Sequence, residues 1–293
     1  MSTSVTVLES VSLVTPLGVR FWDVAMEAPA GGGLTVTAYR DVWPELTWDA
    51  VEGRNGVYSF RSLPGLQYAS NGLGDDAYWS ANPPTVPYLL SVVDTQNRYL
   101  PFQLSVTLPC RGLSGLFASP VSTGLTPDAT WIPVFSMPSR PVPGTAGIIH
   151  AQLQDDTTGL PASWAMVTAE SSSGTPTTGI ADARGVISLA FPYPEPRNFA
   201  LTSPLGSSVK LTDQTWPVDI TINYTPKASG TSLPFLEDLL QQGSAFAWED
   251  SAHSAPAGSF LLQFGNDLIL RSQNSANGTQ LPVLLVTPAG SPL

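Results

Sequence analysis

The chain has 293 residues, of which 42% are hydrophobic and only 12% are charged, and its formal net charge is −11. This length allows two or three domains with a sizeable core. The acidic balance, with only 12 Lys and Arg residues, excludes the basic stripe that nucleic-acid binding requires, and no apolar run approaches the ~18 residues that span a bilayer.

The low charge density, together with 25 Gly and 28 Pro, is typical of many short strands joined by turns. It also suits a protein whose surface is partly covered by neighbours. Cys110 is the only cysteine, so an intrachain disulfide is excluded and a reducing compartment is tolerated. The start of the chain, Met1-Ser-Thr-Ser-Val5, lacks the basic residues and apolar core of a signal peptide, so we expect a cytoplasmic location on synthesis.

Residues 1–110 contain a succession of strand patterns, which predict a first β-sandwich. The clearest is Tyr99–Leu108, where apolar residues alternate with polar ones so that one face is buried. The segment Asp94–Asn97 predicts the hairpin turn before it. The other strand candidates are 4–15, Val19–Trp22, Leu34–Tyr39, Gly56–Phe60 and Tyr88–Val93.

Residues 111–145 differ in character, because Gly, Ser, Thr and Pro dominate and apolar residues stand alone. We interpret this stretch as an irregular connecting arm that crosses between domains or onto a neighbouring subunit. Two of its apolar anchors, Trp131 and Phe135, are candidate docking residues.

Residues 146–226 return to the strand-and-turn pattern and predict a second β-sandwich. In the last strand of this region, apolar residues from Val218 to Tyr224 share one face. The strand candidates are Gly147–Gln154, Ala165–Ala169, Gly185–Phe191, Ala200–Ser203 and Val218–Tyr224.

Residues 227–293 contain the one convincing helix pattern. Ser232 is suited to cap this helix, Pro234 to its first turn and Gly243 to its end. A helix of about ten residues is too short to be stable alone, so we expect it to dock on another surface. Its candidate docking residues are Phe235, Leu236, Leu239 and Leu240, and the strand candidates that follow are Phe260–Phe264, Leu268–Leu270 and Val283–Val286.

Part of the sequence occurs twice. Asp23 precedes Pro29 at the same spacing as Asp155 precedes Pro161. Further on, Gly56-Val-Tyr-Ser-Phe60 corresponds to Gly185-Val-Ile-Ser-Leu189. Because each copy of a repeat is usually one structural unit, the repeat predicts the same small sandwich in two copies.

The histidines, His150 and His253, offer little for catalysis. His253 has Asp250 and Ser251 beside it, but adjacent residues in one loop do not easily converge into a Ser-His-Asp site. His150 lies in the middle of an expected strand, where packing or hydrogen bonding explains it. We therefore predict no catalytic residue and no enzyme.

Asp75–Asp76 and Asp155–Asp156 could supply carboxylates to Ca²⁺. Turn chemistry explains both pairs, because Asp side chains bond to nearby backbone amides. Arg111 could activate the thiol of Cys110, although a half-buried structural thiol is favoured. We predict no metal site and no cofactor, and we do not expect a small-molecule ligand.

Five aromatic residues crowd the stretch 40–87 outside the strand candidate Gly56–Phe60, in parts of the chain that show no strand pattern. If exposed in one row, they could stack on the sugar faces of a glycan or cell-surface polymer. Alternatively, they pin a long loop to its own sandwich or to a partner subunit, because Trp and Tyr are enriched in interface cores. The residues are Trp43, Trp48, Tyr68, Tyr78 and Trp79.

Three segments of the second sandwich match a known pattern. They are Gly147-Ile-Ile-His-Ala-Gln-Leu-Gln-Asp-Asp-Thr-Thr-Gly-Leu-Pro161, Ala165-Met-Val-Thr-Ala169, and Asp182-Ala-Arg-Gly185 followed by Val-Ile-Ser-Leu. Together they resemble the carboxypeptidase regulatory-like family. The resemblance implies a transthyretin-like β-sandwich and identifies a fold rather than an activity, because the module in that family has no catalytic residues.

A second resemblance extends over nearly the whole chain. Its segments include Gly18-Val-Arg-Phe-Trp-Asp-Val-Ala25, Gly33-Leu-Thr-Val-Thr-Ala38, Leu108-Pro-Cys-Arg-Gly-Leu113 and Gly265-Asn-Asp-Leu-Ile-Leu-Arg271. These resemble accessory proteins of extracellular contractile injection systems, the phage-tail-like particles of bacteria. The resemblance implies a baseplate or tail subunit, partnered by other tail subunits or copies of itself, in a particle that is either released or membrane-associated.

We therefore predict an all-β chain with two tandem transthyretin-like or immunoglobulin-like β-sandwiches, at 1–110 and 146–226. The connecting arm occupies 111–145, and a C-terminal docking segment at 227–293 holds one short helix and a small β region. The favoured function is a non-enzymatic structural subunit. The alternative is a module that binds a glycan or a cell surface for the particle.

Overall fold

The structure of the chain is a computed structural model, which describes residues 15–60, 62–66, 73, 75–111, 113, 125–142, 144–171, 175–195, 211–226 and 233–289. Several sequence-based expectations lie outside these residues. They are residues 4–14 of the strand candidate 4–15, the strand Ala200–Ser203, the helix cap Ser232 and the aromatic residue Tyr68.

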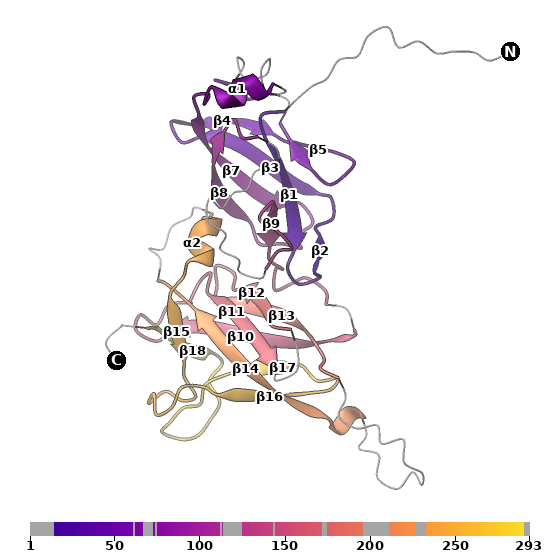
Figure 1. The fold of residues 1–293 in the computed structure, drawn as a ribbon. Coiled ribbons are helices and arrows are strands. Elements are labelled where there is room, and N and C mark those ends of the chain that lie inside the picture. The colour runs from indigo at the N-terminus through magenta and orange to yellow at the C-terminus, as the bar shows by residue number, and fades with distance from the viewer. Residues whose placement is uncertain are drawn as a thin grey trace, which may run out of the picture.

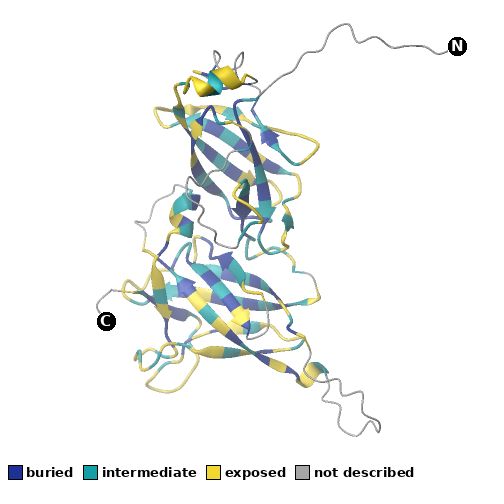
Figure 2. Ribbon diagram, in the orientation of Figure 1, coloured by how far each residue is buried: buried dark blue, intermediate teal, exposed yellow. Residues whose placement is uncertain are grey.

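Two β units lie one above the other along the long axis of the molecule (Figure 1). Buried and exposed residues alternate along many of the strands (Figure 2), and each unit has its own apolar core. The prediction of an all-β chain built from β-sandwiches is confirmed. Neither helix in the described ranges is long and apolar enough to cross a membrane.

The first unit packs two sheets around one core. One sheet has the order β4-β3-β7-β8, and the other has the order β2-β1-β6-β5 with β9 also paired to β1. Phe21, Phe60 and Tyr88 are among its largest fully buried side chains. The elements are β1 (Gly18–Asp23), β2 (Ala28–Pro29), β3 (Leu34–Arg40), β4 (Trp43–Asp49), β5 (Val51–Glu52), β6 (Tyr58–Ser59), α1 (Asp76–Ser80), β7 (Val86–Asp94), β8 (Phe102–Leu108) and β9 (Trp131–Val134).

The stretch 40–87 contains two strands, β4 and β5, and one helix, α1, that were not predicted from the sequence. β4 forms because it pairs with β3, for example with Asp49 opposite Thr37. Nearly every residue of β4 is exposed, so the strand has no alternation that a sequence pattern could reveal. α1 begins after Asp75, whose carboxylate accepts a hydrogen bond from the Ala77 amide at 2.9 Å.

Part of the stretch that we interpreted as a connecting arm is a strand of the first unit. β9 lies parallel to β1, with Ile132 opposite Phe21. Ile132, Val134 and Phe135 are 1%, 0% and 3% exposed, and all three belong to the first core. These apolar anchors therefore fill the core of their own unit, because β9 completes a sheet whose edge would otherwise be open.

The second unit is one sheet with the strand order β12-β11-β14-β15-β18-β10-β13, in which β16 also pairs with β14 and β17 with β10. The end strands β12 and β13 contact each other, so the sheet curves round its core. The elements are β10 (Ala146–Asp155), β11 (Met166–Ser171), β12 (Thr177–Ile180), β13 (Val186–Pro192), a 3-10 turn (Leu211–Asp213), β14 (Thr215–Asn223), α2 (Leu236–Leu240), β15 (Ser244–Ala247), β16 (Ser259–Gln263), β17 (Leu268–Leu270) and β18 (Leu284–Pro288).

Four strands of the C-terminal segment, β15 to β18, belong to this sheet, although the sequence favoured a separate docking arm. β15 and β18 occupy the middle of the strand order. Leu262, Leu284 and Val286 are each 0% exposed and lie in the second core. The boundary at 226 and 227 therefore separates strands that share one sheet, which a reading of local patterns could not detect.

The repeat in the sequence corresponds to equivalent strand pairs in the two units. In the first unit, β1 and β6 are antiparallel and Val19 lies opposite Tyr58. In the second unit, β10 and β13 are antiparallel and Ala151 lies opposite Ile187. Aligning the copies on their aspartates and glycines makes these two registers equivalent.

Each unit also closes in the same way, through a strand from its C-terminal end. β9 pairs in parallel with β1, so that Val134 lies opposite Asp23. β18 pairs in parallel with β10, so that Val286 lies opposite Asp155. Since the two aspartates are equivalent in the repeat, the repeated unit includes a closing strand that the sequence comparison missed.

The glycine turn of the repeat has the same geometry in both copies. Gly56 and Gly185 have φ values of +68° and +73°, a conformation that favours glycine. The Gly56 amide donates to the Gly53 carbonyl at 3.1 Å, and the Gly185 amide donates to the Asp182 carbonyl at 3.0 Å. The Asp182 carboxylate also accepts from the Arg184 amide at 2.8 Å, so Asp and Gly shape this turn together.

α2 is five residues long, shorter than the helix of about ten residues that the sequence favoured. Phe235 occupies its N-cap position, and no side chain caps the helix. Leu236 and Leu239 are 1% and 3% exposed, and they belong to the core of the first unit. A helix that follows the second unit's β14 in sequence therefore docks on the first unit, beside β8 (Figure 1).

Candidate functional site

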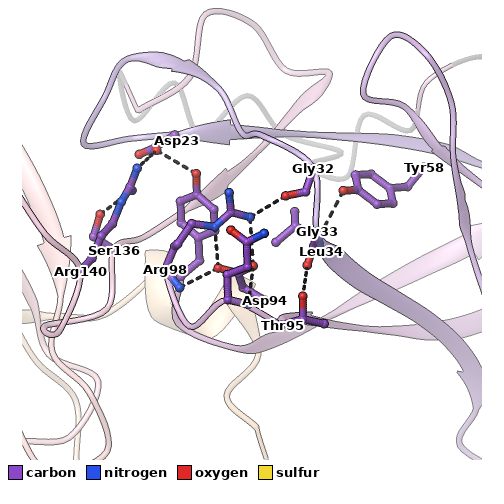
Figure 3. A network of polar contacts seen from close by, with 12 residues as sticks. Asp23, Gly32, Gly33, Leu34, Tyr58, Asp94, Thr95, Arg98, Ser136 and Arg140 are labelled. Carbon is purple, nitrogen blue, oxygen red and sulfur yellow. Dashed lines mark hydrogen bonds and ion pairs between the residues drawn. The ribbon is translucent and has the colours of Figure 1, made fainter.

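A network of polar contacts involves the end of β1 and the segment that leads to the second unit (Figure 3). At its centre is Asp23, which is 3% exposed. Its carboxylate accepts hydrogen bonds from the amides of Ala25 and Met26 at 3.1 and 3.2 Å. It also accepts from the Tyr99 hydroxyl at 2.9 Å and from the Arg140 guanidinium at 2.7 Å. These donors replace the water that the buried carboxylate loses.

Two guanidinium groups lie over the ring of Tyr99. The Cζ atoms of Arg98 and Arg140 are 5.1 and 4.8 Å from the ring centroid. Burial, and then the neighbouring Asp23 carboxylate, raise the pKa of Tyr99 to about 12. The phenol therefore stays protonated at neutral pH and donates its proton to Asp23.

A second ion pair holds the β7–β8 hairpin beside the glycine-rich turn before β3. Asp94 is 4% exposed and accepts from Arg98 Nε at 2.9 Å and from the Arg98 amide at 2.6 Å. Arg98 Nη2 donates onward to the Gly32 carbonyl at 2.7 Å. Burial alone would raise the pKa of Asp94, but the hydrogen bonds from Arg98 outweigh it and hold the pKa below its ordinary value.

Arg140 connects this network to the link between the units. It lies between β9 and β10 in the chain, and its Nη1 donates to the Ser136 hydroxyl at 2.9 Å. A small cavity at this point is lined by Met26, Met137 and Arg140 from the first unit and by Ser188 and Ala190 from β13. The ion pair to Asp23 therefore anchors the connecting segment where the two units approach each other.

α2 forms a second connection across the junction. The Gln103 amide of β8 donates to the Pro234 carbonyl at 2.8 Å, and the Ser105 amide donates to the Glu237 carboxylate at 3.0 Å. Behind the helix, Gln242 Nε2 donates to the Trp164 carbonyl of the second unit at 2.8 Å. The segment thereby covers the edge of β8 and ties it to the second unit, which also protects that edge from pairing elsewhere.

A buried Asp–Tyr pair also occurs in the second unit. Asp155 is 1% exposed and accepts from the Thr157 amide at 2.9 Å and from the Tyr224 hydroxyl at 3.3 Å. Burial, and then Asp155, raise the pKa of Tyr224 to about 12. The carboxylate that we considered for Ca²⁺ is thus engaged in a turn and in a tyrosine contact, as the turn interpretation expected.

The Ser-His-Asp combination does not assemble. His253 Nε2 lies 2.7 Å from an Asp156 carboxylate oxygen, whereas the Ser251 hydroxyl is 3.0 Å from that of Ser275. The Asp250 carboxylate accepts from the backbone of its own turn. The geometry therefore places the serine and the histidine in separate contacts.

Within the described residues, the remaining histidine, His150, belongs to no larger cluster of possible metal ligands. His150 Nε2 lies 3.8 Å from the Asp267 carboxylate on the surface of the second unit. Over the described ranges, no group of three or more His, Cys, Asp or Glu side chains gathers in a way that could hold a metal ion.

Cys110 is half-buried, and its thiol lies 3.9 Å from the Pro16 carbonyl. Arg111, which could have activated the thiol, forms an ion pair with Asp76. This placement agrees with a structural thiol and gives Asp76 an ion-pair partner in the protein itself.

The predicted aromatic residues do not form one exposed row. Trp43 is 47% exposed, whereas Trp48 is half-buried and packs against the first core. The Trp79 indole donates to the Leu73 carbonyl at 3.0 Å, and its ring meets Tyr78 edge to face at 5.3 Å. Trp48, Tyr78 and Trp79 therefore pack within their own unit, and Trp43 is left as the exposed indole of the described set.

The predicted docking residues also act largely within the chain. Phe135, Leu236 and Leu239 are buried in the first core, and Leu240 packs against it. Trp131 is half-buried, with the Arg20 guanidinium carbon 3.9 Å from its ring centroid. The packing of α2 on the first unit was expected as docking, but its partner surface could not be read from the sequence.

Apart from Asp23, which marks the start of the repeat, the residues of the junction network were not predicted from the sequence. Tyr99 and Arg140 lie 76 and 117 residues further along the chain. No local spacing connects such distant residues. A pattern search could have found only the Asp94–Arg98 spacing, which closes a single hairpin.

The fold and the junction define an all-β protein made of two tightly connected β-sandwich units. A scan against protein-family models finds no match, and no curated protein sequence matches. The resemblance to the carboxypeptidase regulatory-like family therefore rests on the quoted sequence segments alone, because no family model matches the chain.

Two solved structures show remote similarity to the chain. One is a Streptococcal ancillary pilin, with 14% identity over 88% of this chain and 62% of that chain, and a TM-score of 0.22. The other is a mutant of the shaft pilin spaA from Lactobacillus rhamnosus GG, with 10% identity over 94% of this chain and 99% of that chain, and a TM-score of 0.21. The chain thus spans less than two thirds of the ancillary pilin, and scores this low carry no argument about this protein.

Proposed function

We propose that this protein is a non-enzymatic structural subunit whose two sandwiches act as one rigid block in a larger assembly. The observation that carries the proposal is the position of α2, which follows β14 of the second unit and buries Leu236 and Leu239 in the core of the first. A flexible pair of domains would not share core residues in this way, because interfaces between mobile domains are usually small and polar.

The two connections across the junction restrict different motions. The Arg140–Asp23 ion pair fixes the connecting segment at one point, and α2 fixes the edge of β8 at another. Two separate attachment points oppose both bending and rotation. Close-packed cores on each side then pass a load from one unit to the next with little deformation.

The surface of the protein also suits contact with neighbours. Only 12% of the residues are charged, and large apolar side chains are exposed on both units. A neighbouring subunit would cover exposed apolar side chains of this kind. Those that lie on strands include Trp43, Leu46, Phe246, Leu261 and Ile269.

The narrower proposal is a baseplate or tail accessory subunit of a contractile injection system. Its support is the sequence resemblance over segments such as Gly18–Ala25 and Gly265–Arg271. In this proposal the protein is made in the cytoplasm and is then built into a particle with other tail subunits. A rigid two-sandwich block suits a position that must keep its shape while the particle contracts.

The test combines light scattering and negative-stain imaging of the purified protein, first alone and then with tail or baseplate components. Rings, or incorporation into the particle, would support the proposal. A monomer that ignores those components would refute the injection-system assignment. Small-angle scattering would test rigidity separately, since a distribution of inter-unit distances much broader than one conformation would contradict a rigid block.

A further inference from the structure

A pocket on the first unit lies beside the turn between β3 and β4. One of its lining residues, Ser105, also donates its amide to Glu237 of the α2 connection. Arg40, Asp41 and Val42 of the turn form one side. The other side comes from β7 and β8, and the remaining lining residues are Pro87, Tyr88, Leu89 and Ser105. The pocket thus combines a cation, a hydroxyl group and apolar walls.

Arg40 is unusual among the arginines of the described ranges because it is half-buried and has no carboxylate within ion-pair distance. Arg20, Arg98, Arg140 and others each pair with an aspartate. Nε of Arg40 is buried and has no hydrogen-bond partner in the described part of the chain. Asp41 also lines the pocket, but it forms no ion pair with Arg40. Partial burial of a cation without a direct ion-pair partner is unfavourable, so an incoming carboxylate that contacts Arg40 would recover free energy.

Two exposed apolar side chains lie beside Arg40. Val42, which lines the pocket, is 65% exposed, and Trp43, which contacts Arg40, is 47% exposed. The Arg40 guanidinium carbon lies 4.9 Å from the centroid of the Trp43 ring, which partly stabilises the cation. Trp and Arg are the residues that most often dominate binding energy at protein interfaces, especially when apolar neighbours exclude water around them.

We propose that this pocket binds a single carboxylate side chain, flanked by apolar residues, from a neighbouring polypeptide in the assembly. The inference rests on the proposed structural function and adds the chemistry of one contact. The carboxylate pairs with Arg40, and the flanking apolar side chains pack on Val42 and Trp43. The Asp41 carboxylate, which also lines the pocket, would repel a ligand with several negative charges. The single cation of Arg40 therefore suits a ligand with one carboxylate.

The probe is the peptide Ac-Ser-Leu-Glu-Leu-Ser-NH2, titrated into the ¹⁵N-labelled full chain and followed by NMR. We expect saturable shifts of the Trp43 indole N–H and of the Leu89 and Ser105 amides. Because a charge-assisted contact is worth at least about a tenfold change in affinity, the peptide with Gln in place of Glu should bind about tenfold more weakly or worse. Arg40→Gln should weaken binding of the Glu peptide to the same extent.

Arg54→Gln is the matched control, because Arg54 is an exposed arginine outside the pocket and its replacement removes the same charge. This variant should bind the peptide as the native chain does. Thermal unfolding of both variants shows whether the fold is retained, and Arg40→Lys, which keeps the charge, should restore part of the affinity if Arg40→Gln proves unstable.

Three outcomes would overturn the inference. Equal binding of the Glu and Gln peptides would show an apolar surface without carboxylate recognition. Propionate with the same affinity as the peptide would show a small-molecule site, and no shifts at millimolar peptide would show no site. The peptide titration does not measure incorporation into a particle, which light scattering and imaging test separately. Failure of this contact is therefore distinguishable from failure of the structural function.

Discussion

Replacing Leu239 of α2 with alanine should destabilise the first unit, although the helix follows β14 of the second unit in the chain. Leu239 is 3% exposed and lies in the first core. A buried leucine cut to alanine costs about 2–5 kcal/mol. We expect the lower end of this range, about 2 kcal/mol, because a five-residue helix can move to reduce the cavity.

Hydrogen exchange at β8 measures this effect directly. The amides of Gln103 and Ser105 donate to Pro234 and Glu237, so both amides are protected only while the α2 segment is docked. If the exchange-competent opening is detachment of α2, a loss of about 2 kcal/mol corresponds to roughly thirtyfold faster exchange. The midpoint temperature of thermal unfolding of the first unit should also be lower in this variant than in the native chain.

Leu262→Ala is the matched control, because Leu262 is 0% exposed and lies in the second core. It should destabilise the second unit and leave exchange at Gln103 and Ser105 nearly unchanged. If Leu239→Ala leaves both amides protected and the first unit as stable as before, then α2 does not belong to the first core and the argument for a rigid block fails.

Three other predictions concern the buried carboxylate, the raised tyrosine pKa and the repeat turn. Arg140→Met should cost about 3 kcal/mol in urea unfolding, because Asp23 stays buried without its cation; a loss below 0.5 kcal/mol would contradict this. The native Tyr99 pKa of about 12 against an ordinary value of 10.0 means that the unfolded state ionises first, so stability should be intact below pH 10 and should fall by the order of 2 kcal/mol between pH 10 and 12. Tyr99→Phe should have a shallower decline in unfolding free energy between pH 10 and 12, and an identical slope would refute the pKa shift. Gly185→Ala should be much more destabilising than Gly56→Ala in thermal unfolding, because both residues have positive φ but only a Cβ at 185 would meet a backbone oxygen, at 2.4 Å; equal losses would contradict the packing argument.

The sequence by itself determined the strands with clear alternation and the turns that depend on particular residue types. β7, β8, β10 and β14 alternate between one buried face and one wet face, which is a local property of the chain. Gly56 and Gly185 were found as equivalent positions of the repeat, and both have the positive φ that selects glycine. The repeat that contains them indicated that one structural unit occurs twice.

Only the tertiary structure decided how each unit closes and where α2 packs. β9 and β18 pair in parallel with first strands that lie far away in the chain, and neither has a pattern that specifies such a partner. β4 is a strand only because β3 offers it hydrogen bonds. The same holds for the contacts of Asp23 with Tyr99 and Arg140, because strand pairing, burial and ion pairing depend on proximity in space and not on separation along the chain.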